Sequence, residues 1–148
     1  MANWLYDFGR NEFAKGSIHW KSSGGDTIRA FLVDALSYTA NSAVHDYLDD
    51  VPTNSRFGNS GLSARTQAPQ ITLIDPSAGV CDGNDITFTT VPAGNALEYI
   101  LIFKDDGAAD SSSPLIALID TATGLQVTPN GGDINVAWDN GSNKIFKL

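Results

Sequence analysis

Short apolar segments bounded by Gly, Pro, Asn, Asp and Ser dominate the second half of the chain. The segment 97–104 is apolar on both sides of its middle, which predicts a central strand covered on two faces. The segment 115–120 is similarly apolar, and we expect the two to pair antiparallel across the polar loop 105–114. Strands this short cannot cover their own apolar side chains, so a second layer must pack against them.

Alternating apolar and polar residues predict further, half-buried strands. We expect these strands at residues 17–21, 27–35, 85–91, 125–128, 134–138 and 144–148. Turn residues at 22–26 predict a hairpin between the first two strands, and turn residues at 139–143 predict one between the last two. Trp20 and Trp138 fall on the apolar sides of their segments, which favours a place in the core over a sugar-binding platform.

Two other parts of the chain have different patterns. Residues 3–15 predict a short helix, with Asn3 as its N-cap and Gly16 as its stop. Residues 37–70 are rich in Asn, Ser, Gly and Thr, which predicts a long loop or extended arm. We therefore expect one mainly β domain, an antiparallel β-sandwich or jelly-roll-like fold with a short N-terminal helix and a long extended loop.

Charge narrows the range of partners. The 148 residues include seventeen acidic and nine basic side chains, and the net charge of −8 opposes phosphate backbones and anionic lipid headgroups. We therefore expect no nucleic acid and no membrane among the partners. The longest apolar runs fall short of the roughly 20 residues that cross a bilayer, and the first residues do not resemble a signal peptide. These patterns indicate synthesis in the cytoplasm.

The sequence offers little for catalysis or metal binding. His19 and His45 are the only histidines, and residues 58–62 stop short of a Gly-x-Ser-x-Gly nucleophile motif. Cys81, the single cysteine, is expected to be an inert thiol in or near a strand. Residues 82–85 resemble the start of a calcium loop but lack its later ligands, so an ordinary turn is expected. We predict a protein that is not an enzyme and has no cofactor or metal.

The beginning and the end of the chain carry a resemblance. The first part contains Trp4-Leu5-Tyr6-Asp7 and Asp26-Thr27-Ile28-Arg29-Ala30, and the last part contains Val127-Thr128-Pro129-Asn130-Gly131-Gly132-Asp133-Ile134. These stretches resemble small structural proteins of tailed bacteriophages, among them capsid decoration (cement) proteins. The resemblance implies a virion protein, made in the host cytoplasm, that stabilises the shell of the major capsid protein. It also implies a homotrimer without catalytic residues. The acidic charge favours the outer capsid surface over the lumen, because packaged DNA would repel the chain.

Aromatic and cationic residues of the N-terminal segment and the long loop are the expected partner contacts. These are Trp4, Tyr6, Phe8, Arg10, Phe13, Tyr47, Arg56, Phe57 and Arg65. Three alternatives stay open: a structural protein of the tail, neck or baseplate, a host-glycan-binding adhesin, and a hydrolase that uses His19 or His45 as its base.

Overall fold

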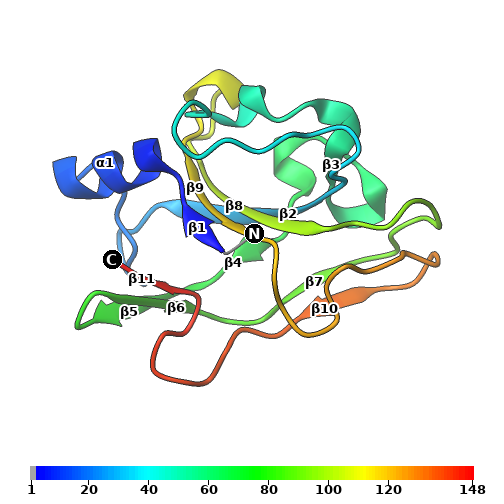
Figure 1. Cartoon of the computed structure of the whole chain (residues 1–148). Helices are drawn as coiled ribbons and strands as arrows, with labels where there is room; N and C mark the ends of the chain where they lie inside the picture. The colour runs from blue at the N-terminus through cyan, green and yellow to red at the C-terminus, as the bar shows by residue number, and fades with distance from the viewer. Residues whose placement is uncertain (1–2) are drawn as a thin grey trace.

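The strands of the computed structural model, which describes residues 3–148, form three antiparallel sheets (Figure 1). The main sheet has six strands, in the order β1-β9-β8-β2-β3, and β4 also pairs with β2. These strands are β1 Trp4–Leu5, β2 Thr27–Val33, β3 Arg56–Phe57, β4 Gln70–Ile71, β8 Tyr99–Asp105 and β9 Leu115–Ile119.

Two smaller sheets lie below the main sheet in Figure 1. One has the order β11-β6-β5, and the other pairs β10 with β7. Their bounds are β5 Leu73–Ser77, β6 Val80–Gly83, β7 Ile86–Phe88, β10 Ile134–Val136 and β11 Phe146–Lys147. The prediction of a mainly β, antiparallel fold is confirmed. Sheets of six, three and two strands differ from the paired four-stranded sheets of a jelly roll, so that form is not confirmed.

Strand β8 lies inside the main sheet, between β9 and β2, as its sequence predicted. Ile100 and Ile102 belong to the lower core, between the main sheet and the smaller sheets. Leu101 and Phe103 belong to the upper core, on the opposite face. Each face of β8 therefore has its own apolar cover, which explains why the segment shows no polar side.

Strand β9 pairs antiparallel with β8, as predicted, and contains a β-bulge. The register passes from Ile102 opposite Ala117 to Phe103 opposite Leu115, which leaves Ile116 as the extra residue. Ile116 and Ala117 consequently both belong to the lower core, although they are neighbours in sequence.

The single α-helix of residues 3–148, α1, spans Asp7–Lys15 and lies against β9. It begins later than predicted because Trp4–Leu5 pairs with β9 as strand β1. Asn3 is therefore not the N-cap. Its side-chain oxygen instead accepts hydrogen bonds from the backbone N–H groups of Asp120 and Thr121. The predicted stop at Gly16 is confirmed, with φ of 75° in the left-handed region.

Residues 37–70 do not form an extended arm. They fold over the upper face of the main sheet, and Tyr38, Leu48, Val51 and Ala68 are buried there against the upper core. The segment contains β3, β4 and four short 3-10 helices: η1 Leu48–Asp50, η2 Thr53–Ser55, η3 Asn59–Gly61 and η4 Arg65–Gln67. A fifth, η5 Asp110–Ser112, lies in the loop between β8 and β9. The prediction was based on the polar composition of residues 37–70 and did not take into account the few apolar residues that anchor the segment to the core.

Both predicted hairpins are wrong. Residues 17–21 are not a strand, because β2 already has β8 on one side and β3 and β4 on the other. Ile18 and Trp20 are nevertheless buried in the lower core, as the alternation required. At the other end of the chain, β10 pairs with β7 and β11 pairs with β6.

The predicted strand at 125–128 is also absent from the described structure, where this segment forms only an isolated bridge between Val127 and Leu97. The remaining predicted strands are present with shifted ends. The apolar alternation located buried or half-buried positions in most of these strands, although Leu148 is 55% exposed. The choice of partner strand depended on distant segments.

Candidate interaction surface

A groove lined by both polar and apolar side chains runs between the main sheet and the smaller sheets along one side of the molecule. It consists of three adjoining hollows of about 400, 180 and 250 Å³ that share lining residues. We call this groove the seam. Its lining includes Asn3, Trp4, Leu5, Ile100, Ile119, Leu125, Val127, Ile134, Val136, Trp138, Asp139, Lys144, Ile145, Phe146 and Lys147. The volume of the largest hollow is within the range of ligand sites.

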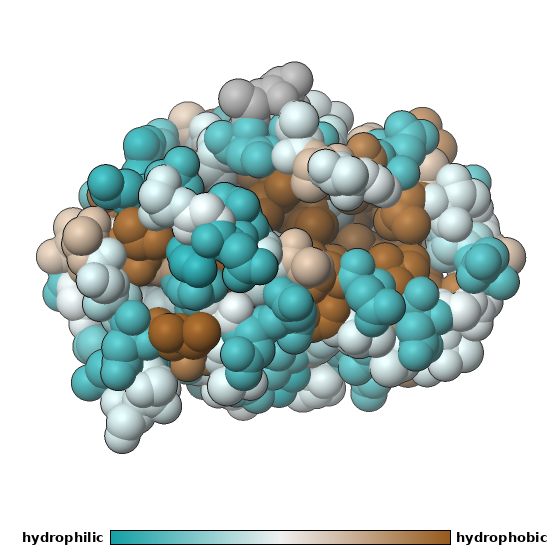
Figure 2. All heavy atoms as spheres, turned by 90° about the horizontal axis from the view of Figure 1, so that it is seen from below, coloured by the Kyte–Doolittle hydropathy of each residue, from teal (hydrophilic) through white to brown (hydrophobic). Residues whose placement is uncertain are grey.

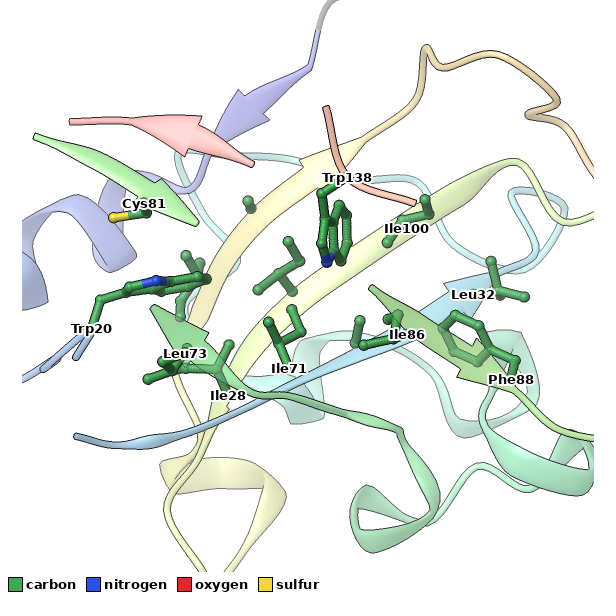
Figure 3. Packing of buried hydrophobic residues seen from close by; sticks show 14 of the residues in the cluster. Trp20, Ile28, Leu32, Ile71, Leu73, Cys81, Ile86, Phe88, Ile100 and Trp138 are labelled. Atoms are coloured by element: carbon green, nitrogen blue, oxygen red, sulfur yellow. The ribbon is translucent and has the colours of Figure 1, made fainter. Parts of the chain in front are cut away.

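The floor of the seam is held by Trp138 and Ile100. Trp138 is tied down twice: its backbone N–H donates to Asp85 at 2.9 Å, and its indole Nε1–H donates to the carbonyl of Asn84 at 3.1 Å. Figure 3 shows the indole ring pointing toward β8 beside Ile100. These two hydrogen bonds fix the orientation of the indole ring. The prediction that Trp20 and Trp138 are core residues is confirmed.

The walls of the seam are only partly covered. Ile119, Ile134, Val136 and Ile145 are half-buried and pack against the edge of the lower core. Figure 2 shows the molecule from below, with apolar side chains at the bottom of a hollow between polar rims. The sandwich is thus left open where its two layers should meet.

The charge along the seam differs from that of the whole chain. The residues that line its three hollows include one carboxylate, Asp139, and two ammonium groups, Lys144 and Lys147. Lys144 Nζ lies 3.7 Å from Asp82, and Lys147 has no ion pair within residues 3–148. Since Asp82 and Asp139 lie beside Lys144, the groove carries little net charge, in a chain with a net charge of −8.

The sequence was compared with protein families and with curated proteins. No family model and no curated protein matches the chain. The seam must therefore be interpreted from its geometry and from the physical chemistry of its side chains.

Two of the predicted contact residues are interior, which corrects the expectation for them. Tyr6 is fully buried, its hydroxyl lies 2.9 Å from that of Tyr38, and burial raises the pKa of Tyr6 far above its usual range. Arg56 is buried beneath the 37–70 segment, where its guanidinium donates to the carbonyl of Val51 and to Asp110. Both residues stabilise the fold and are not available to a partner.

Arg65 and Phe57 also serve the fold. Arg65 contacts Asp105, which also binds Arg29 of β2 at 2.7 Å, so this network ties the 37–70 segment to the main sheet. Phe57 packs against the lower core. Neither residue lines the seam.

The remaining predicted contacts surround α1. Phe8 and Tyr47 are half-buried and lie against each other, with ring centroids 4.7 Å apart. Phe13 meets Phe146 of β11, and Arg10 is exposed and pairs with Asp7. Trp4 lines one hollow of the seam.

The sequence pattern did not indicate that Lys144, Lys147 and the half-buried apolar residues of the C-terminal segment line a groove. The alternation of apolar and polar residues in this segment was interpreted as the pattern of core strands. Nothing in the sequence indicated that one side of the sandwich would stay open.

The groups with possible chemistry are scattered. Burial raises the pKa of the Cys81 thiol to about 11, so it is neutral at ordinary pH. His19 is exposed, and His45 Nδ1 lies 2.9 Å from the hydroxyl of Tyr38. Within residues 3–148, no group of three His, Cys, Asp or Glu side chains is placed to hold a metal ion. No helix in the same part of the chain is long and apolar enough to cross a membrane.

Proposed function

We propose that this chain is a virion structural protein of a tailed bacteriophage, a capsid decoration protein that binds the major capsid protein and stabilises the shell. The seam is the observation that carries the proposal. A groove with an apolar floor and half-buried apolar walls is suited to holding a segment of another protein. The resemblance of the N-terminal and C-terminal stretches to phage structural proteins gives that partner its class.

The charge of the chain supports a place on the outside of the shell. A domain with a net charge of −8 is repelled by packaged DNA, so the outer surface is more favourable than the lumen. A protein that binds assembled subunits but not free ones stabilises the assembly by mass action. A homotrimer at a symmetry axis would multiply the number of such contacts.

The direct test compares particles with and without this protein. Addition of the chain to stripped particles should raise the temperature at which they release DNA, measured by dye fluorescence during heating. Val136→Asp, which places a carboxylate on the seam wall, should weaken particle binding by at least about tenfold. Val44→Asp is the matched control, because Val44 is 64% exposed and does not line the seam.

Absence of the chain from mature particles, or equal binding by both variants, would refute the proposal. The copy number distinguishes the alternative of a tail, neck or baseplate protein, since a shell protein is present in hundreds of copies and a tail protein in far fewer. Quantitative mass spectrometry of purified particles supplies that number.

A further inference from the structure

The sequence contains two asparagine–glycine pairs, Asn130-Gly131 and Asn140-Gly141. Both pairs lie outside the strands, and all four residues are exposed. Asparagine followed by glycine is chemically labile, because glycine has no side chain to hinder the approach of its backbone nitrogen to the asparagine side chain. The two pairs therefore place the same reactive groups in two different parts of the fold.

Hydrogen bonds hold the first pair in place. The N–H of Gly131 donates to the carbonyl of Val91 at 2.8 Å. The side-chain oxygen of Asn130 accepts from the N–H of Gly132 at 3.0 Å. Val91 is fully buried, and its own N–H donates to the carbonyl of Gly132 at 3.0 Å. Both groups that would have to react are therefore bonded, in a turn that is anchored to the core.

The second pair has no such partners. Within residues 3–148, neither the N–H of Gly141 nor the side-chain amide of Asn140 forms a hydrogen bond. The backbone carbonyl of Asn140 accepts from Lys144 Nζ, at 3.5 Å. The pair lies in the loop between β10 and β11, which contains neither helix nor strand over residues 137–145 (Figure 1). No hydrogen bond in this part of the chain holds the Gly141 nitrogen away from the side chain of Asn140.

Two charged groups lie beside the peptide bond between Asn140 and Gly141. The Lys144 ammonium at the Asn140 carbonyl favours loss of the Gly141 amide proton, although Lys144 Nζ also lies 3.7 Å from Asp82. The Asp139 carboxylate opposes that loss, because a Cβ atom on Gly141 would lie 2.7 Å from its Oδ2. The two charges have opposite effects, so the difference between the two pairs comes from the hydrogen bonding of the backbone.

We infer that Asn140 is a site of spontaneous covalent modification, in which water converts its side-chain amide to a carboxylate, and that the fold protects Asn130 from the same reaction. The Gly141 nitrogen bonds to Asn140 Cγ, the bond from Cγ to Nδ2 breaks, and ammonia leaves with the Gly141 amide proton. Water then opens the cyclic imide. Opening at Cγ gives aspartate, and opening at the backbone carbonyl gives isoaspartate, whose main chain runs through Cγ. This inference goes beyond the proposed function and does not depend on it.

The products would change the seam in two ways. Either product adds a carboxylate next to Asp139, which lines the largest hollow. Isoaspartate also lengthens the main chain by one atom between Trp138 and Ile145, which line the same hollow. Aspartate therefore changes the charge beside the seam, whereas isoaspartate changes its charge and its geometry.

The test follows both asparagines in one sample of the full chain. After incubation in mildly alkaline buffer, the chain is digested and mass spectrometry measures the gain of about 1 Da at each site. Asn140 should react at least about tenfold faster than Asn130, because Asn130 can react only after its turn opens and its hydrogen bonds break. In urea, where the turn is unfolded, the two sites should react at similar rates.

Two kinds of result would overturn the inference. The first is an equal rate at the two sites of the folded chain, or a faster reaction at Asn130. The second is a preference for Asn140 that persists undiminished in urea, because the local sequence and not the fold would then be its cause.

Two matched variants check which residue supplies the product. Asn140→Gln can close only a six-membered ring, which forms far more slowly, so it should remove most of the acidic form that ion-exchange chromatography separates. Asn130→Gln should leave the amount of that form unchanged. An undiminished acidic form in Asn140→Gln, with circular dichroism showing the native fold, would also contradict the inference. None of these measurements depends on whether the chain binds particles.

Discussion

Gly9 of helix α1 lies so close to β9 that a Cβ atom at this position would be 2.4 Å from the carbonyl oxygen of Leu115. A glycine that weakens an isolated helix is thus what allows this helix to pack on the main sheet. Gly9→Ala should lower the free energy of unfolding by about 1–3 kcal/mol, although alanine favours helices by about 1 kcal/mol. Urea unfolding followed by tryptophan fluorescence measures the change.

The control is Asn11→Ala, an exposed position of the same helix, which should raise stability by a few tenths of a kcal/mol. If Gly9→Ala were as stable as the unaltered chain, α1 would not pack as closely on β9 as the structure shows.

The buried ion pair between Arg56 and Asp110 should behave differently from an exposed one. Their atoms Nη1 and Oδ2 are 2.6 Å apart, and the Arg56 side chain is 2% exposed. Asp110→Asn leaves the buried guanidinium without its charged partner, and since Asp110 is partly exposed we expect a loss of about 1–2 kcal/mol. A double-mutant cycle with Arg56→Met should give a coupling energy of about 1–3 kcal/mol.

The comparison is the exposed pair of Arg10 and Asp7, which should show a coupling below about 0.5 kcal/mol. Equal coupling in the two cycles would mean that the 37–70 segment does not shield Arg56 from water.

The three tryptophans differ in their indole hydrogen bonds. The Nε1 of Trp4 is buried without a partner in the described structure, whereas Trp20 donates to the carbonyl of Asp82 at 2.8 Å and Trp138 donates to that of Asn84. Trp20→Phe and Trp138→Phe should each cost about 1 kcal/mol more than Trp4→Phe, because only they leave a carbonyl unpaired. Thermal unfolding ranks the three variants. If Trp4→Phe lowered the unfolding temperature more than the other two variants, the assignment of the indole hydrogen bonds would be contradicted.

Burial of Cys81 makes stability depend on high pH. Its raised thiol pKa, about 11, lies above that of an unfolded cysteine, about 8.5, so the folded chain retains the proton longer. The stabilisation is complete below the unfolded pKa and is lost as the pH rises through the folded value. The difference in unfolding free energy between the unaltered chain and Cys81→Ala should therefore shrink between about pH 9 and 11.

Alkylation gives an independent check. At pH 8, iodoacetamide should modify Cys81 far more slowly in the folded chain than in urea, because the folded thiol is neutral and buried. Equal rates would show that the strand β6 opens readily.

Local sequence patterns predicted which residues are buried better than they predicted which strands pair. The segments 97–104 and 115–120 carried enough apolar residues to identify β8, β9 and their pairing. The hairpin predictions were wrong because a strand can pair with any suitable strand of the chain, including one distant in sequence. Strand β11 pairs with β6 and not with β10. The apolar periodicity within one segment does not indicate which other strand that segment pairs with.

The seam could not have been predicted for the same reason. Val136 and Ile145 have the alternation of ordinary core residues, and only the separate placement of β10 and β11 leaves them half-covered. Tyr6 and Arg56 show the opposite error, because they were predicted to be partner contacts and are buried. An aromatic ring and a guanidinium suggest an interface in a polar segment, but here both are enclosed by the fold of 37–70.

The pairing of β2 with β8 also sets the pace at which this molecule can form. Thr27 lies opposite Asp105 and Val33 opposite Tyr99, so both strands and the long segment between them must be available before the main sheet exists. Closing the long loop between β2 and β8 costs chain entropy before the contacts between the two strands can form. We therefore expect refolding in the slow range of about milliseconds to seconds. During synthesis the first third of the chain must wait for a partner that emerges much later, with its apolar side chains accessible to chaperones throughout.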